Sequence, residues 1–80
     1  MSESRFDLVW HLPLELGLMT HVTLFDTGNE RRSMVAIGHG WDEADALLDL
    51  WTMLTRRGDD AAIAYVASAY TKRTGERPTR

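Results

Sequence analysis

Three histidines are the residues best suited to metal binding in this 80-residue chain, which has no cysteine. His11, His21 and His39 fall in segments that the sequence predicts as strands, where His21 and His39 would be cross-strand neighbours. A zinc site needs three or four converging ligands that are themselves held in place by hydrogen bonds. No His-x-x-x-His or carboxylate–histidine spacing is present, so we interpret these histidines as ordinary surface or half-buried residues. The sequence predicts no metal and no cofactor.

A group of acids is the second candidate for chemistry. Asp42, Glu43, Asp45 and Asp49 lie at the start of a predicted helix, where Asp45 and Asp49 would share one face at a spacing of four residues. Acids in a first helical turn also complement the positive end of the helix dipole, and Asp42 is a suitable N-cap. We therefore interpret this group as a helix start rather than a metal site.

Gly38 and Gly40 bracket one residue just before the same helix, an arrangement that can cradle a phosphate. A dinucleotide-binding fingerprint needs a third glycine and a βαβ setting, and the acids that follow oppose an anion. We interpret the glycines as a hinge. Gly40 is expected either at positive φ or where the backbone closely approaches the helix.

Catalytic patterns are absent from the sequence: it has no Ser-His-Asp or Cys-His order, Walker loop or paired catalytic carboxylates. We therefore predict that the protein is not an enzyme. The net charge of −3 argues against a generic nucleic-acid binder. No run of about 18 apolar residues exists, so we predict no membrane contact. The N-terminus does not resemble a signal peptide, which makes the cytoplasm the expected location.

Alternating apolar and polar residues predict three strands, at 5–12, 18–26 and 33–39. The second has apolar residues on both faces and is therefore expected to be the central strand. Pro13 ends the first strand or marks an edge of the sheet, because it offers no ladder N–H.

Two helices are predicted, at 42–56 and 60–73. Gly58 suits the left-handed position after the first helix, Asp59 or Asp60 caps the second, and Gly75 ends it. The fold class is α+β, a three-stranded antiparallel sheet followed by two C-terminal helices. We expect a disordered N-terminus at 1–4, a single domain at 5–74 and a basic C-terminal tail at 75–80.

The β-β-β-α order with a glycine hinge, carried by Gly-His-Gly-Trp-Asp-Glu-Ala-Asp-Ala at 38–46, resembles the sheet-and-helix unit of HicB-type antitoxins. It is also similar to the C-terminal half of the double-stranded RNA-binding domain. That domain opens this helix with lysines that grip phosphate, whereas Asp42, Glu43 and Asp45 stand here and would repel a phosphate backbone. The resemblance therefore implies the shape and not the RNA activity. For the antitoxin resemblance, no recognisable DNA-binding module follows the helix.

The sequence is compatible with two functions. The first is a small intracellular interaction or regulatory protein that works as a homodimer, because the first helix is apolar over roughly 200° of its circumference. Another protein partner is also compatible with this surface. The expected interface residues are Ala46, Leu50, Met53, Trp41, Tyr65 and Tyr70.

The alternative function is a nucleic-acid-binding module that uses the basic loop and the C-terminal tail, which the overall charge disfavours. Its contact residues would be Arg31, Arg32, Lys72, Arg73, Arg77 and Arg80. The sequence has three pairs of adjacent basic residues, at 31–32, 56–57 and 72–73. They could bind nucleic acid together only if they converged on one face, and such pairs are more often the solvated ends of helices and strands.

Overall fold

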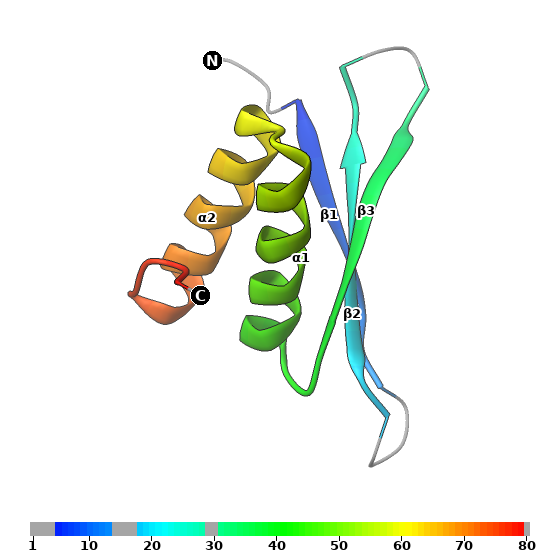
Figure 1. The fold of residues 1–80 in the computed structure, drawn as a ribbon. Coiled ribbons are helices and arrows are strands. Elements are labelled where there is room, and N and C mark those ends of the chain that lie inside the picture. Colours follow the sequence, from blue (N-terminus) through cyan, green and yellow to red (C-terminus); the bar gives the residue numbers. More distant parts are fainter. Residues whose placement is uncertain (1–4, 14–17, 29–30, 80) are drawn as a thin grey trace.

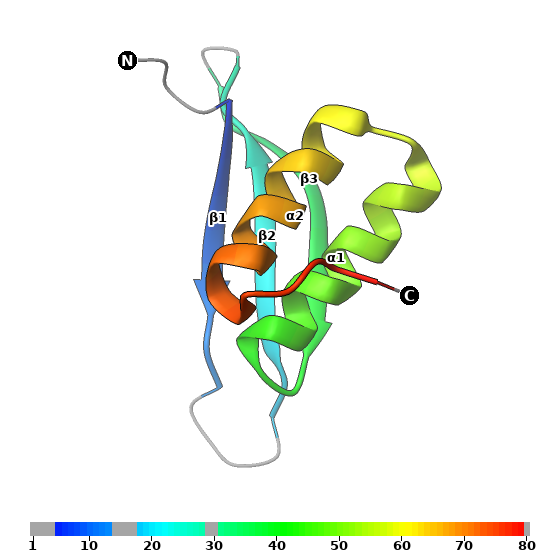
Figure 2. The same cartoon turned by 90° about the vertical axis from the view of Figure 1, so that its left-hand side faces the viewer.

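A computed structural model describes residues 5–13, 18–28 and 31–79. Three antiparallel strands form one sheet in the order β1-β2-β3, and both helices pack on one face of it (Figures 1 and 2). The elements are β1 Phe6–His11, β2 Thr20–Asp26, β3 Ser33–Gly40, α1 Glu43–Arg57 and α2 Asp60–Thr74. The predicted α+β fold is thereby confirmed. Residues 1–4, predicted to be disordered, lie outside the described ranges.

The strand β2 is central, as predicted, and its register fixes which residues share a face. It pairs with β1 from Phe6–Asp26 to His11–His21, and with β3 from Thr20–Gly40 to Asp26–Ser33. An irregularity between Leu24 and Phe25 leaves Val35 without an opposite residue. On either side of it, alternate residues point to opposite faces of the sheet.

The helix ends follow the predicted capping pattern. The side chain of Asp42 accepts a hydrogen bond from the Asp45 N–H at 2.8 Å, and Asp59 plays the same part for α2. Gly58 and Gly75 close the two helices with φ of 77° each, a left-handed conformation that glycine adopts without strain. Each helix therefore starts and stops where its local chemistry requires.

The glycine hinge works by close approach. Gly40 does not have positive φ, and the other expected arrangement, a close approach to the helix, is the one observed. A Cβ on Gly40 would instead overlap the backbone of Asp45 and Ala46, and one on Gly38 would lie 2.7 Å from Leu50 Cβ. The two glycines let α1 sit directly on β3.

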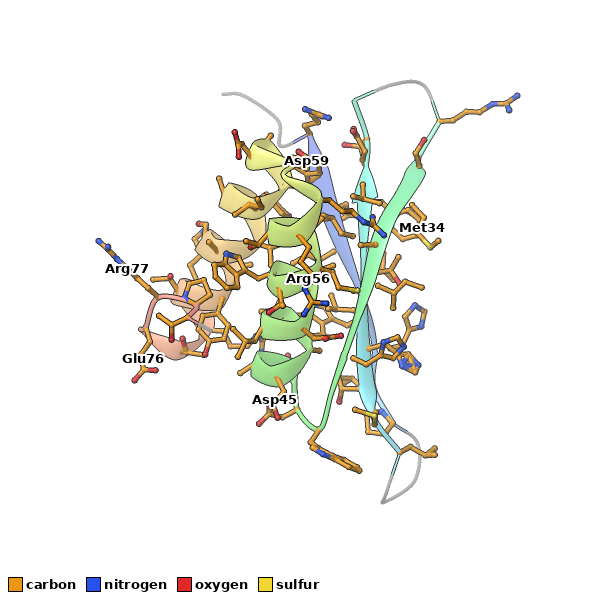
Figure 3. All side chains as sticks on the ribbon, in the orientation of Figure 1. Met34, Asp45, Arg56, Asp59, Glu76 and Arg77 are labelled. Atoms are coloured by element: carbon orange, nitrogen blue, oxygen red, sulfur yellow. The ribbon has the colours of Figure 1, made fainter. Side chains whose placement is uncertain are left out.

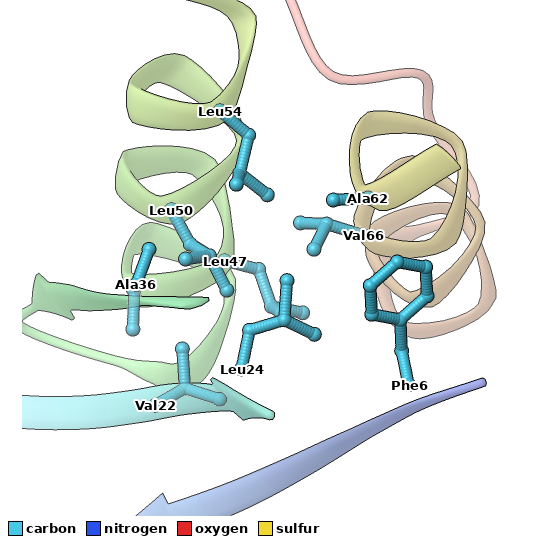
Figure 4. Packing of buried hydrophobic residues seen from close by; sticks show 10 residues of the cluster. Phe6, Val22, Leu24, Ala36, Leu47, Leu50, Leu54, Ala62 and Val66 are labelled. Carbon is cyan, nitrogen blue, oxygen red and sulfur yellow. The ribbon is translucent and has the colours of Figure 1, made fainter. Parts of the chain in front are cut away.

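The hydrophobic core lies between the sheet and the helix pair (Figure 4). It is formed by Phe6, Val22, Leu24, Ala36, Ala46, Leu47, Leu50, Leu54, Ala62 and Val66. No helix in the described part of the chain has the length and apolarity needed to cross a bilayer.

Candidate interaction surface

The helix residues expected at an interface lie mostly inside the subunit. Ala46 and Leu50 are fully buried in the core, so the prediction that they line a contact between subunits is wrong for this fold. The wide apolar face of α1 is covered on one side by the sheet and on the other by α2 (Figure 4). Met53, Tyr65 and Tyr70 are partly buried and pack against the same core.

Trp41 is the exception among these residues. It lies in the turn between β3 and α1, and 69% of it is exposed. A large exposed aromatic ring is a suitable interface anchor, and the structure leaves this predicted role open to test.

The sheet face opposite the helices is left uncovered by α1 and α2 (Figures 1 and 3). Because side chains alternate along a strand, the register places nine residues on it in three rows. We call this surface the open face. Its rows are Asp7–Phe25–Met34, Val9–Thr23–Ile37 and His11–His21–His39.

Two rows of the open face are mainly apolar. Val9, Phe25 and Ile37 are half-buried by their neighbours, whereas Met34 is 61% exposed. The Arg32 guanidinium lies 4.4 Å from the Phe25 ring centroid and donates a hydrogen bond to Asp7 at 2.9 Å. An exposed ion pair therefore borders the apolar rows at one end.

The third row is a ladder of histidine rings. The ring centroids of His11 and His21 are 5.9 Å apart, and those of His21 and His39 are 5.1 Å apart, which confirms that His21 and His39 are cross-strand neighbours. The Nδ1 atom of His21 is buried and has no hydrogen-bond partner among the described residues. Across those same residues, no group of three or more His, Cys, Asp or Glu side chains is arranged to hold a metal ion.

Three of the four acids at the start of α1 have structural partners for their side chains. Asp42 caps the helix, Asp49 accepts a hydrogen bond from the His39 N–H at 2.8 Å, and Glu43 forms an ion pair with Arg73. These contacts agree with the interpretation of the acids as part of the helix start.

The arginines expected to contact nucleic acid lie on different sides of the molecule. Arg32 lies on the open face, whereas Arg73 stacks over Trp10 on the helix-covered side, 4.9 Å from its ring centroid. Arg31 is exposed in the connection before β3, and Arg77 follows α2 (Figure 3). Arg80 lies outside the described residues. Arg32 and Arg73 thus cannot contribute to one phosphate-binding patch.

A groove of about 480 Å³ runs between β1 and the helices. We call it the β1–α2 groove. It is lined by Leu8, Trp10, Leu47, Ala69, Lys72 and Arg73. The sequence analysis missed this groove, although Trp10 on the inward face of an edge strand and the basic end of the second helix were both visible signals.

The perturbed ionisable pair lies at the start of β1, where Arg5 meets Asp26. Arg5 donates to Asp26 at 2.9 Å, and the Gly28 N–H donates to the same carboxylate at 2.8 Å. These hydrogen bonds lower the pKa of Asp26, and the carboxylate raises the pKa of Arg5. The pair joins β1 to the end of β2 and has a structural role.

Comparison with known proteins gives no match: no family model, no curated relative and no solved structure is significantly similar to this chain. The resemblance of residues 38–46 to HicB-type antitoxins and to the double-stranded RNA-binding domain therefore stays a prediction.

Proposed function

We propose that the protein is a small non-enzymatic interaction or regulatory protein that acts as a homodimer through the open face. The observation that supports this best is the apolar surface formed there by Val9, Phe25, Met34 and Ile37, which neither helix covers. Contiguous exposed apolar surface is typical of interfaces. A chain of 80 residues buries only roughly 60–65% of its unfolded surface, so association would add stability that it lacks alone.

The row pattern suits a second copy of the same chain. A two-fold axis that lies between two facing sheets, perpendicular to the strands, reverses the order of the rows. The Val9–Thr23–Ile37 row then packs on its own copy, and Asp7 faces His11 of the partner subunit. A carboxylate opposite an imidazole is a complementary pair, and the symmetry produces it twice.

The size of the open face sets the strength that we expect. Three strands of six to eight residues present a surface of roughly 14 by 20 Å. Such a contact belongs at the small end of specific interfaces. We therefore expect a homodimer that dissociates in the micromolar range.

Sedimentation equilibrium across about 5–200 µM tests the proposal, a range chosen around this expected affinity. The parent should approach twice the subunit mass at the upper end. Ile37→Glu, on the open face, should remain monomeric, because it places two charges in a desolvated contact. Met53→Glu on α1 is the matched control and should still dimerise.

Thermal melts of both variants establish that they are folded. A monomeric parent throughout the range contradicts the proposal. So does an Ile37→Glu variant that dimerises as the parent does. Loss of the dimer in Met53→Glu alone would place the interface on the helices instead.

Nucleic-acid binding is the less well supported function, because Arg32 and Arg73 lie on opposite sides of the sheet. Co-migration with DNA or RNA on a sizing column at low and moderate salt would favour it. A nucleic-acid-free dimer would favour the interaction protein.

A further inference from the structure

We propose that the outer edge of β1 at Leu8 and Trp10, together with the β1–α2 groove beside it, binds an extended acidic peptide segment of another protein by strand addition. In this mode a peptide joins the sheet through main-chain hydrogen bonds, and its alternate side chains enter neighbouring pockets. The inference does not depend on the homodimer, because the edge is separate from the surface that two open faces would share.

The hydrogen-bond pattern shows which backbone groups of β1 point outward. The Arg5 carbonyl accepts from the Thr27 N–H at 2.6 Å across the β1–β2 pair. Residues that bond to one neighbouring strand alternate along an antiparallel ladder. It follows that Asp7 and Val9 bond to β2, whereas Leu8 and Trp10 direct their N–H and C=O groups away from the sheet.

The other edge of the sheet is protected in a way that β1 is not. On β3, the His39 N–H donates to the Asp49 carboxylate at 2.8 Å, and Arg57 donates to the Val35 carbonyl at 2.5 Å. Both side chains come from α1, which satisfies part of that edge. Within the described ranges, no side chain makes a comparable bond to the backbone from Asp7 to His11. The edge that can accept a further strand is therefore β1.

The β1–α2 groove lies where the side chains of an added strand would project. Leu8 and Trp10, whose backbone groups face outward, also contribute their side chains to its lining. Alternate residues of an added strand would enter this groove below α2, and the residues between them would extend the open face. One segment would therefore be bound by its backbone and by every second side chain.

The charges at the rim favour an acidic segment. Lys72 is exposed and has no ion-pair partner among the described residues. Arg73 stacks on Trp10 and is paired with Glu43, the one acid that forms an ion pair with these cations within the described ranges. After that pairing the rim keeps the positive charge of Lys72, which attracts a carboxylate on an incoming strand.

The same charges disfavour a second copy at this edge. If β1 paired with its own copy about a two-fold axis, both helix layers would lie on one side of the extended sheet. When such a pairing is centred near Trp10, Lys72 approaches its equivalent, and these like charges oppose the contact. An acidic segment of a different protein meets no such repulsion.

A nuclear magnetic resonance titration with a designed probe tests the proposal. The probe is the capped heptapeptide acetyl-Glu-Val-Glu-Val-Glu-Val-Glu-amide, added to isotope-labelled protein. We expect shifts at the Leu8 and Trp10 amides and at the Trp10 indole N–H, with no comparable shift at His39 on the opposite edge. A control peptide with lysine in place of each glutamate should bind at least about tenfold more weakly.

Backbone methylation of the peptide separates strand addition from charge attraction alone. In an antiparallel pair, the residues opposite Leu8 and Trp10 both point into the groove and supply the bonding N–H groups. We expect the glutamates at these positions, because Lys72 lines the groove. N-methylation of the glutamates should therefore abolish binding, and N-methylation of the valines should leave binding unchanged. If both methylated peptides bind as the parent peptide does, strand addition is wrong.

A charge reversal on the protein completes the test. Lys72→Glu should weaken binding at least about tenfold, whereas Arg56→Glu, an exposed cation on α1, should change it less than about twofold. Equal binding of the acidic and lysine peptides, or no shift at Leu8 and Trp10 with millimolar peptide, overturns the proposal. Shifts at these residues that depend on protein concentration without peptide would assign the edge to a second copy, and they also overturn it.

Discussion

The two faces of the sheet are built from alternate residues of the same three strands, yet they differ in what they demand of each side chain. On the covered face, α1 approaches so closely that β3 presents Gly38 and Gly40, while β2 contributes the fully buried Leu24. On the open face, the neighbouring positions carry larger side chains such as Phe25 and Ile37. We therefore expect the packing of α1 to restrict side-chain size on the covered face more strictly than on the open face.

The sharpest form of this comparison is a pair of adjacent residues on β3. Gly38→Val should lower the free energy of unfolding by about 3 kcal/mol or more, because its Cβ would meet the Ala46 carbonyl and Leu50. Ile37→Val, one residue away on the open face, should cost less than about 1 kcal/mol. Urea denaturation measures both. Similar losses would mean that the two faces are equally constrained, which breaks the comparison.

A second pair compares truncations on the two faces of β2. Leu24→Ala removes a fully buried side chain and should cost about 2–5 kcal/mol. Phe25→Ala removes a larger but half-buried ring and should cost less than half as much when measured in dilute protein, where the monomer dominates. A greater loss for Phe25 in dilute protein would show that the open face is part of the subunit's own stability.

The turn that leads from β3 into α1 ends at the N-cap of α1, Asp42. Asp42→Ala should destabilise the fold by about 1 kcal/mol, because the Asp45 N–H loses its acceptor. Asp42→Ser should cost less, since a serine hydroxyl can also cap. Thermal unfolding of both variants distinguishes capping from any other role, because equal losses in the two would exclude capping as the reason.

The smallest expected effect is a pH dependence at the strand ends. The folded-state pKa of Asp26 is below its ordinary value, so the Arg5 pair stabilises the fold above about pH 4 and is lost as pH falls through that lowered value. Asp26→Asn should flatten this part of the stability profile. Parallel profiles for parent and variant in chemical denaturation between pH 5 and about pH 2 would contradict it.

Much of the fold follows from the sequence because its local signals agree. Strand alternation, the caps at Asp42 and Asp59 and the glycines after each helix place every strand and helix to within about two residues. Each of these features depends on neighbours in the chain, so each can be inferred from short segments.

The interaction surface was harder to predict because it depends on which elements meet in space. The apolar stripe of α1 indicates that Leu50 is covered, but not whether the sheet, α2 or another subunit covers it. The fold gives that role to the subunit's own core. Predicting the open face requires the register of all three strands, because this register brings His11, His21 and His39 into one row.

The chain holds two isoleucines, and they lie on opposite sides of the molecule, which makes their methyl groups a direct test of the open-face homodimer. Ile37 is on the open face, and Ile63 packs against the core from α2. With both methyl groups labelled, dilution from about 500 to 10 µM spans the affinity expected of so small a contact. The Ile37 signal should move as the dimer dissociates, while the Ile63 signal stays in place. An Ile63 signal that moves while Ile37 does not, or two signals that never move, would contradict the open-face dimer.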